Sequence, residues 1–197
     1  MKKTLSLIAI VGSLLTTSAY AKTEGNYAGI DILRTSAKHK YKSDGVTSSK
    51  FDDSSIGVGV NYKHAFNFNQ VFLAPGVFFD QLGTKSKDSD GGKVSASYRY
   101  GAKLDLGYDI TDDFAVYFTN GLSNLHYSVD WNNTGDGKKS GSKLGYVYGG
   151  GLSYKIAKNL VVNLEYNTQS VDLKTPLTSS KVASSIRVAK VGLSYNF

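Results

Sequence analysis

The chain has 197 residues, a formal net charge of +7 and no cysteine, so an exported form of it would have no disulfide support. Its 23 basic residues are scattered among Asp, Ser and Gly rather than gathered in a stripe, which argues against a nucleic-acid partner. Fourteen Tyr, nine Phe and 21 Gly against two Pro are typical of a strand-rich chain.

The first 21 residues have the three parts of a secretory signal peptide. Lys2 and Lys3 precede the apolar stretch 4–15, and Ala19-Tyr20-Ala21 is a small-x-small cleavage site. The apolar stretch is shorter than the roughly 20 residues that cross a bilayer as a helix. We therefore expect a cleaved signal peptide at 1–21 and one exported domain at 22–197. No later run is long and apolar enough for a transmembrane helix, so strands must make any membrane span.

Eight segments after the signal peptide alternate large apolar residues with small or polar ones, the period-two pattern of strands. In chain order they lie within residues 26–33, 54–64, 70–81, 100–110, 113–131, 144–156, 159–167 and 189–197. Pro75 lacks an N–H and predicts a bulge or one missing ladder bond in the third segment. The sequence therefore predicts an all-β chain of eight strands.

The fifth segment changes its apolar parity between Phe118 and Leu125. If all its large apolar residues share one face, one residue must be extra, which predicts a bulge between Thr119 and Asn124. Leu125, Tyr127 and Val129 would then face the same way as Phe118, while His126 and Ser128 would face the opposite way.

The connectors between the segments alternate in length. Short turns are expected at 66–69, 110–113 and 157–159, and long polar loops at 36–53, 83–93, 132–143 and 172–185. Short turns at one end and long loops at the other are typical of an outer-membrane barrel. We expect the long loops to face outward from the cell.

The small face of the strands indicates which side meets lipid. A soluble lipocalin-like barrel would turn its apolar face inward and its small face to water, where glycine only weakens a strand. Glycine is useful inside a narrow eight-stranded tube, and ten glycines share the small face: Gly29, Gly57, Gly59, Gly76, Gly101, Gly107, Gly145, Gly149, Gly151 and Gly192. The sequence therefore predicts an eight-stranded antiparallel up-and-down transmembrane β-barrel whose apolar face points to lipid.

Three stretches carry a family resemblance. LGYDITDDFAVY (106–117) and GGGLSYKIAKNLVVNLEY (149–166) resemble strands and turns of the eight-stranded OmpA transmembrane domain, and KVGLSYNF (190–197) resembles its last strand. KVGLSYNF also resembles the terminal targeting signal of outer-membrane barrels, carried by Lys190, Gly192, Tyr195 and Phe197. The resemblance implies insertion by the barrel-assembly machinery. Without the peptidoglycan-binding domain of full OmpA proteins, the layout is closer to OmpX-like and opacity-type surface antigens.

Strand parity places nine charged residues in the barrel interior: Asp31, Lys63, Asp80, Arg99, Lys103, Asp105, Lys155, Glu165 and Lys190. Confined charges persist when they are paired and hydrogen-bonded, and the family resemblance implies such a network. The alternative is an ion pathway lined by these groups. An eight-stranded barrel is only wide enough for its own side chains, which favours a filled interior.

A catalytic interpretation rests on His126-Tyr127-Ser128, which resembles the His-x-Ser of the lipid A deacylase family. That chemistry needs a base beside a hydroxyl, a carboxylate that orients the imidazole, and residues that face lipid. The parity turns His126 and Ser128 inward, and GKKSG (137–141) supplies no acid. His39, His64 and His126 lack metal-ligand spacing. We expect no catalytic residue, no metal site and no cofactor.

The sequence therefore favours a non-enzymatic, monomeric outer-membrane protein that acts as a surface antigen or contact protein through four exposed loops. Its expected partners are outer-membrane lipid and lipopolysaccharide, the barrel-assembly machinery, and host or cell-surface ligands bound by the loops. A small porin-like channel is the first alternative, and a lipid-modifying enzyme is the second.

Overall fold

The computed structural model describes residues 23–43, 46–87, 93–130, 138–174 and 181–197. The predicted signal peptide at 1–21 lies outside these residues. Within them, no helix has the length and apolar character needed to cross a membrane.

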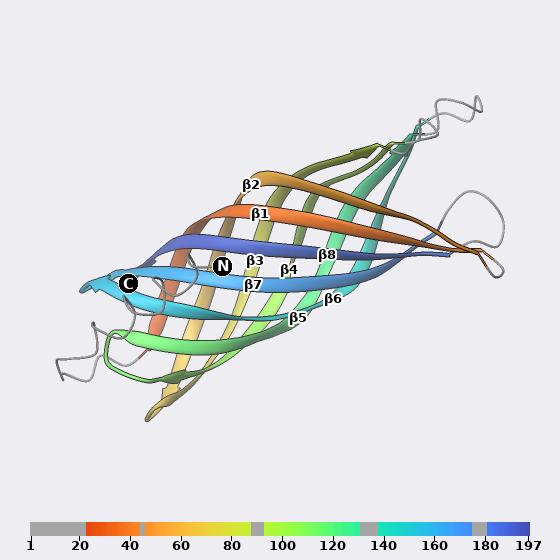
Figure 1. Cartoon of the computed structure of the whole chain (residues 1–197). Helices are drawn as coiled ribbons and strands as arrows, with labels where there is room; N and C mark the ends of the chain where they lie inside the picture. Colours follow the sequence, from red (N-terminus) through yellow and green to blue (C-terminus); the bar gives the residue numbers. More distant parts are fainter. Residues whose placement is uncertain (1–22, 44–45, 88–92, 131–137, 175–180) are drawn as a thin grey trace, which may run out of the picture.

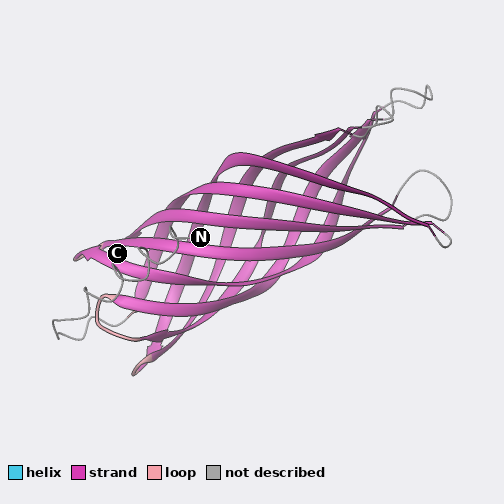
Figure 2. Cartoon of the chain, in the orientation of Figure 1, coloured by secondary structure: helices cyan, strands magenta, loops and turns pink. Residues whose placement is uncertain are grey.

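Eight antiparallel strands close into one barrel in sequence order, and β8 pairs back with β1 (Figures 1 and 2). This confirms the predicted fold class. The strands are β1 Gly25–Ser43, β2 Val46–Phe68, β3 Val71–Lys87, β4 Lys93–Asp109, β5 Phe114–Asp130, β6 Lys138–Ala157, β7 Leu160–Lys174 and β8 Lys181–Asn196.

Three short turns and the carboxyl terminus share one end of the barrel (Figure 1). Asn69 and Gln70 join β2 to β3, and Asn69 has a φ of 74°, a left-handed conformation that Asn tolerates. The Asp109 N–H donates to the Gln70 carbonyl at 2.8 Å, which ties the first turn to the start of the next. By the usual orientation of such barrels, this end is periplasmic.

The four long connectors were predicted as loops, and most of their length is strand instead. The β1–β2 ladder runs on from Ser36↔Ser54 to Ser43↔Val46, so much of 36–53 forms a hairpin. The other three long connectors also shrink, and the segments between their strands fall outside the described residues. Backbone hydrogen bonds do not need apolar side chains, so a ladder can continue into polar sequence that shows no alternation.

The predicted bulge in β5 is also wrong. The β5–β6 register runs unbroken from Phe114↔Tyr154 to Asp130↔Lys138, and the irregularity lies in β4, between Ala96 and Tyr98. With no extra residue in β5, Leu125 lies inside the barrel, where it is 1 % exposed. The prediction assumed that every large apolar residue faces lipid, and that rule fails where the interior itself is apolar.

Pro75 interrupts the β2–β3 ladder as expected. The paired positions pass from Lys63↔Gly76 directly to Phe66↔Leu73 without a change of register. Because proline has no N–H to donate, the strand loses ladder bonds at this point rather than forming a bulge.

The interior is layered along the barrel axis. At the end with the short turns, Phe72, Tyr117 and Val161 belong to an inner apolar cluster. At the opposite end, Leu33, Leu125 and Ile186 belong to an outer apolar cluster. A layer of buried charged side chains lies between the two clusters, while the outer face of the barrel exposes large apolar residues on every strand.

Glycines make room for the largest interior side chains. A Cβ on Gly107 would fall within the ring of Phe72, and one on Gly151 would contact the ring of Tyr117. Both rings are buried in the inner cluster. The glycine-rich face is therefore the inside of the tube, as its composition predicted.

Candidate functional site

The charged layer begins with Asp80 of β3, which is fully buried and accepts from two cations. Arg99 of β4 donates through Nε at 2.9 Å to one carboxylate oxygen, and Lys190 of β8 donates at 2.8 Å to the other. Lys190 also lies 3.9 Å from Asp31 of β1, which accepts from Asn61 at 2.9 Å. Four strands thus meet around Asp80.

The second half of the layer centres on Lys103 of β4. Lys103 forms an ion pair with Glu165 of β7 and lies 3.5 Å from Asp105, which also pairs with Lys63 of β2 at 3.1 Å. Tyr117 of β5 donates its hydroxyl to Glu165 at 3.3 Å.

Asn167 of β7 connects the two halves. Its amide oxygen accepts from Arg99 at 2.8 Å, and its amide nitrogen donates to Glu165 at 2.7 Å. A continuous chain of contacts therefore crosses the interior from Asp31 to Lys63. It contains four acidic and four basic side chains: Asp31, Asp80, Asp105 and Glu165 with Lys63, Arg99, Lys103 and Lys190.

Aromatic rings complete the environment of the cations. The Lys190 ammonium lies 4.9 Å from the centroid of the Phe78 ring, and the Lys63 ammonium lies 4.8 Å from that of Tyr117. Rings in these positions favour a cation within the apolar surroundings. Charges that are balanced, hydrogen-bonded and enclosed by apolar layers suit a structural role better than repeated exchange with passing ions.

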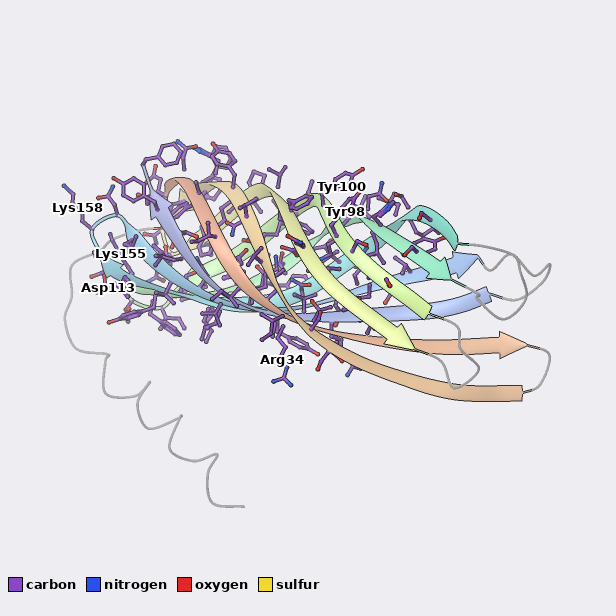
Figure 3. The ribbon with its side chains drawn as sticks, turned by 90° about the horizontal axis from the view of Figure 1, so that it is seen from above. Arg34, Tyr98, Tyr100, Asp113, Lys155 and Lys158 are labelled. Carbon is purple, nitrogen blue, oxygen red and sulfur yellow. The ribbon has the colours of Figure 1, made fainter. Side chains whose placement is uncertain are left out.

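Lys155 of β6 is the one residue of the predicted interior set that lies apart from this chain of contacts within the described residues. It lines a small cavity of about 50 Å³ at the periplasmic mouth, together with Asp109 and Asp113. Figure 3 shows Asp113, Lys155 and Lys158 together at that end of the barrel. Parity places Lys155 on the inner face, but its height along the strand puts it at the rim.

His126 was predicted to point inward, and the structure reverses this. Because β5 has no bulge, Tyr127 packs against the outer apolar cluster inside the barrel and His126 lies on the outer face. The His126 ring stacks on Tyr98 with centroids 4.8 Å apart, and its Nδ1 lies 3.1 Å from the Ser142 hydroxyl. Ser128 shares the strand face of His126.

His126 faces outward, as a lipid hydrolase requires, but its imidazole is not oriented by a carboxylate among the described side chains. Among the described side chains, its hydrogen-bond partner is the hydroxyl of Ser142, not a carboxylate that would hold the imidazole in one tautomer. His126 and Ser142 therefore form a polar pair on the outer face, and His126 stacks on Tyr98.

The residues of the predicted assembly signal divide between the two faces of β8. Tyr195 and Phe197 lie on the outer face and are exposed, whereas Lys190 is buried in the charged layer. Gly192 lies opposite Asp31 in the ladder, where a Cβ would meet the carboxylate.

Sequence reasoning missed the neutral members of the charged layer. Asn167 and Asn61 have no charge to attract notice, yet each contacts an acid of the network. Parity alone could have found Asn167, because it lies two residues after Glu165 on the same strand face.

The fold and this interior define the class: a transmembrane β-barrel with a lipid-facing apolar exterior and a filled, charged core. The family model described as outer membrane protein beta-barrel domain matches residues 7–197. The chain therefore belongs to the outer-membrane β-barrel family, and its location is the outer membrane.

Solved structures agree on the fold. OprG from Pseudomonas aeruginosa is 14 % identical with a TM-score of 0.53, and the match covers 91 % of this chain and 99 % of that one. The outer membrane protease OmpT from Escherichia coli is 10 % identical with a TM-score of 0.53, covering 92 % and 99 %.

Ail, the attachment invasion locus protein of Yersinia pestis, is 19 % identical over 86 % of this chain and 99 % of that one, with a TM-score of 0.43. No curated protein sequence matches the chain.

Proposed function

We propose that the protein is a non-enzymatic surface contact protein, whose barrel anchors four strand-built hairpins outside the cell. The observation that carries the proposal is the length of the strands. A strand crosses the outer membrane with about 9–11 residues. Here β7 has 15 residues and β2 has 23.

The extra length lies at the end opposite the short turns. On β2, the outward apolar side chains that the structure describes begin at Ile56, and the sequence of the ten residues before it is mostly polar. They pair with β1 through the register that ends at Ser43↔Val46. A paired ladder that continues beyond the apolar band presents a stiff polar surface, which suits contact with another surface better than a free loop would.

The filled interior argues against the alternative of a porin-like channel. An ion that crossed the barrel would have to pass two apolar clusters and the paired charges between them. Separating a buried ion pair leaves uncompensated charge, which costs several kcal/mol.

The remaining partners follow from the same proposal. The protein is exported with a cleaved signal peptide at 1–21, is inserted as a monomer by the barrel-assembly machinery, and lies among outer-membrane lipid and lipopolysaccharide. Cell-surface or host ligands bind the hairpins, because lipid covers the wall and side chains occupy the lumen.

The test is to trim the β1–β2 hairpin. Ala37 and Asp53 are paired in the ladder, so an Asn-Gly turn can replace residues 38–52 without a change of register. The matched control keeps the length of the hairpin and replaces its Lys, His and Asp side chains by Ser and Thr. Cells that carry each form are compared for barrel assembly, by heat-modifiable migration, and for binding to an epithelial monolayer.

We expect the trimmed protein to assemble and to bind less, and the same treatment applies to the other three hairpins in turn. Full binding after all four hairpins are trimmed would refute the contact role. Hydrolysis of outer-membrane lipid by the purified protein would refute its non-enzymatic character.

A further inference from the structure

An apolar groove runs across the outside of the barrel wall over β7, β8, β1, β2 and β3. Its volume is about 640 Å³, within the range of pockets that hold small ligands. The side chains that line its centre are Ile30, Ile32, Val58, Val60, Val191 and Leu193, all on the outer face. Gly59 and Gly192, the ladder partners of Asp31, line it with backbone.

Two arginines lie on the extracellular side of this groove, beyond the residues that line it. Arg34 follows Ile32 on the outer face of β1, and Arg187 lies on β8 opposite Ser36. They are diagonal neighbours across the β1–β8 ladder, a spacing of roughly 7–8 Å that long side chains can bridge. Figure 3 shows Arg34 pointing away from the barrel where β1 bends.

Among the side chains that the structure describes on the outer faces of β1, β2 and β8, none is acidic, and Arg34 and Arg187 are the charged ones. No ion pair within that part of the chain involves either arginine.

The height of Arg34 matches the edge of the outer leaflet. Arg34 pairs in the ladder with Ile56, the outermost apolar side chain described on the outer face of β2, and the next outward residue of β2 is Ser54. Arg34 therefore lies where the apolar band of the barrel ends. The Arg34 stem can therefore lie along acyl chains while its guanidinium reaches the headgroups.

We propose that this groove is a binding site for one phosphorylated, acylated lipid of the outer leaflet. An acyl chain lies against Ile30, Val58 and Val191, and Arg34 and Arg187 hold the phosphate. Arginine forms paired hydrogen bonds to phosphate oxygens, and one cation on each of two strands fixes the headgroup above the groove. Charge complementarity at the rim selects an anionic lipid over a second copy of the chain or an apolar peptide.

The test is lipid retention by the full mature protein, refolded in detergent and measured by native mass spectrometry. The probes are bis-phosphorylated lipid A and the same lipid with both phosphates removed. The test variants are Arg34→Gln with Arg187→Gln, and Val58→Phe with Val191→Phe, which narrows the groove. Lys158→Gln at a periplasmic turn and Leu122→Phe on β5 are the matched controls, and heat-modifiable migration verifies that each variant folds.

We expect one bound lipid A, with affinity reduced at least tenfold by loss of its phosphates or by the double arginine replacement, since charged hydrogen bonds are of that strength. Groove filling should also weaken retention, whereas both controls should bind as the parent does. Arg34→Lys should restore part of the affinity to an Arg34→Gln protein.

Equal retention of the two lipids by the parent would overturn the proposal, and this measurement needs no variant. Parental affinity in the double arginine variant would overturn it as well. A dimer peak that disappears on groove filling, with lipid retention unchanged, would assign the groove to a second copy of the chain instead.

Discussion

Asp80 is the single side chain on which the buried charges of the barrel depend most. Its two oxygens hold Arg99 and Lys190, and none of the three side chains is more than 5 % exposed. Asp80→Asn keeps the shape and removes the charge. Because two buried cations then lack a counter-charge, we expect the free energy of unfolding to fall by about 3–5 kcal/mol.

Urea titration of the protein in lipid bilayers measures this loss. Asp113→Asn, at an exposed turn, is the control and should change stability little. A loss for Asp80→Asn no larger than that of the control would show that the network contributes nothing to stability.

Gly107 offers a steric test of the filled interior. A Cβ at this position would lie 2.1 Å from a ring carbon of Phe72, which is fully buried. We expect Gly107→Val to destabilise the barrel by about 1–3 kcal/mol through overpacking. Gly150→Ala, where the nearest atom to the new Cβ is a carbonyl oxygen at 3.1 Å, is the milder control. Equal thermal midpoints for the two variants would contradict the close packing around Phe72.

Residue positions could be predicted from sequence where the period-two rule applies without a break. Glu165 and Lys103 fall inside the barrel because their apolar neighbours face lipid. The same rule failed at His126, since it took Leu125 for a lipid-facing residue. Nothing in a sequence alone distinguishes an apolar side chain that faces lipid from one that closes the interior.

At the scale of the strand, Pro75 weakens the pairing between β2 and β3. The β2–β3 ladder has no paired positions at Ala74 and Pro75. Pro75→Val restores the backbone N–H that proline lacks and keeps an apolar side chain on the outer face. We therefore expect the gap in the β2–β3 pairing to close, with slower amide exchange at Ala65 beside the gap and a gain of roughly 1 kcal/mol in stability. Hydrogen exchange by NMR measures it, with Val77→Ile as the control for a change of lipid-facing bulk. Unchanged amide exchange at Ala65 would mean that other hydrogen bonds already hold β2 and β3 together at this point.

The last strand carries the second prediction at this scale. Tyr195 on the outer face of β8 and Phe197, directly after that strand, are both exposed beside the first strand of the barrel. If they form the assembly signal, Phe197→Ala should lower the outer-membrane yield at native expression severalfold while refolding in detergent stays normal. Leu193→Ala on the same face is the control. The role is refuted if the Phe197→Ala protein reaches the membrane in parental amounts.

Strand ends were less predictable than strand centres. Short turns at 69–70 and 158–159 follow from Asn and Lys between apolar runs. The second matches the expected connector at 157–159 within one residue, whereas the first begins three residues later than the expected 66–69. The hairpins beyond the membrane lack that contrast, because residues such as Ser36 and Ser54 pair through backbone alone. The irregularity in β4 was placed in β5 for a similar reason, since register depends on the neighbouring strand.

As a whole, the molecule is a barrel closed across its width in three layers. The outer apolar cluster, the charged layer and the inner apolar cluster each join side chains from several strands, and their described members come from every strand except β6. These three layers pack against the strands from inside and stabilise the barrel. The extracellular hairpins therefore extend from a rigid barrel. A closed interior and a polar extension beyond the membrane are the two features on which the surface-contact role depends.

Planar-bilayer recording of the refolded mature protein tests the closed interior most directly. At neutral pH and moderate salt, we predict no steady conductance steps above the lipid background, because two apolar clusters and paired charges lie across the lumen. A variant that shortens Leu33, Leu82 and Leu125 to Ala provides a comparison with the outer cluster opened. Steady, reproducible steps from the unmodified protein, retained after the hairpins are trimmed, would contradict the account and establish a channel.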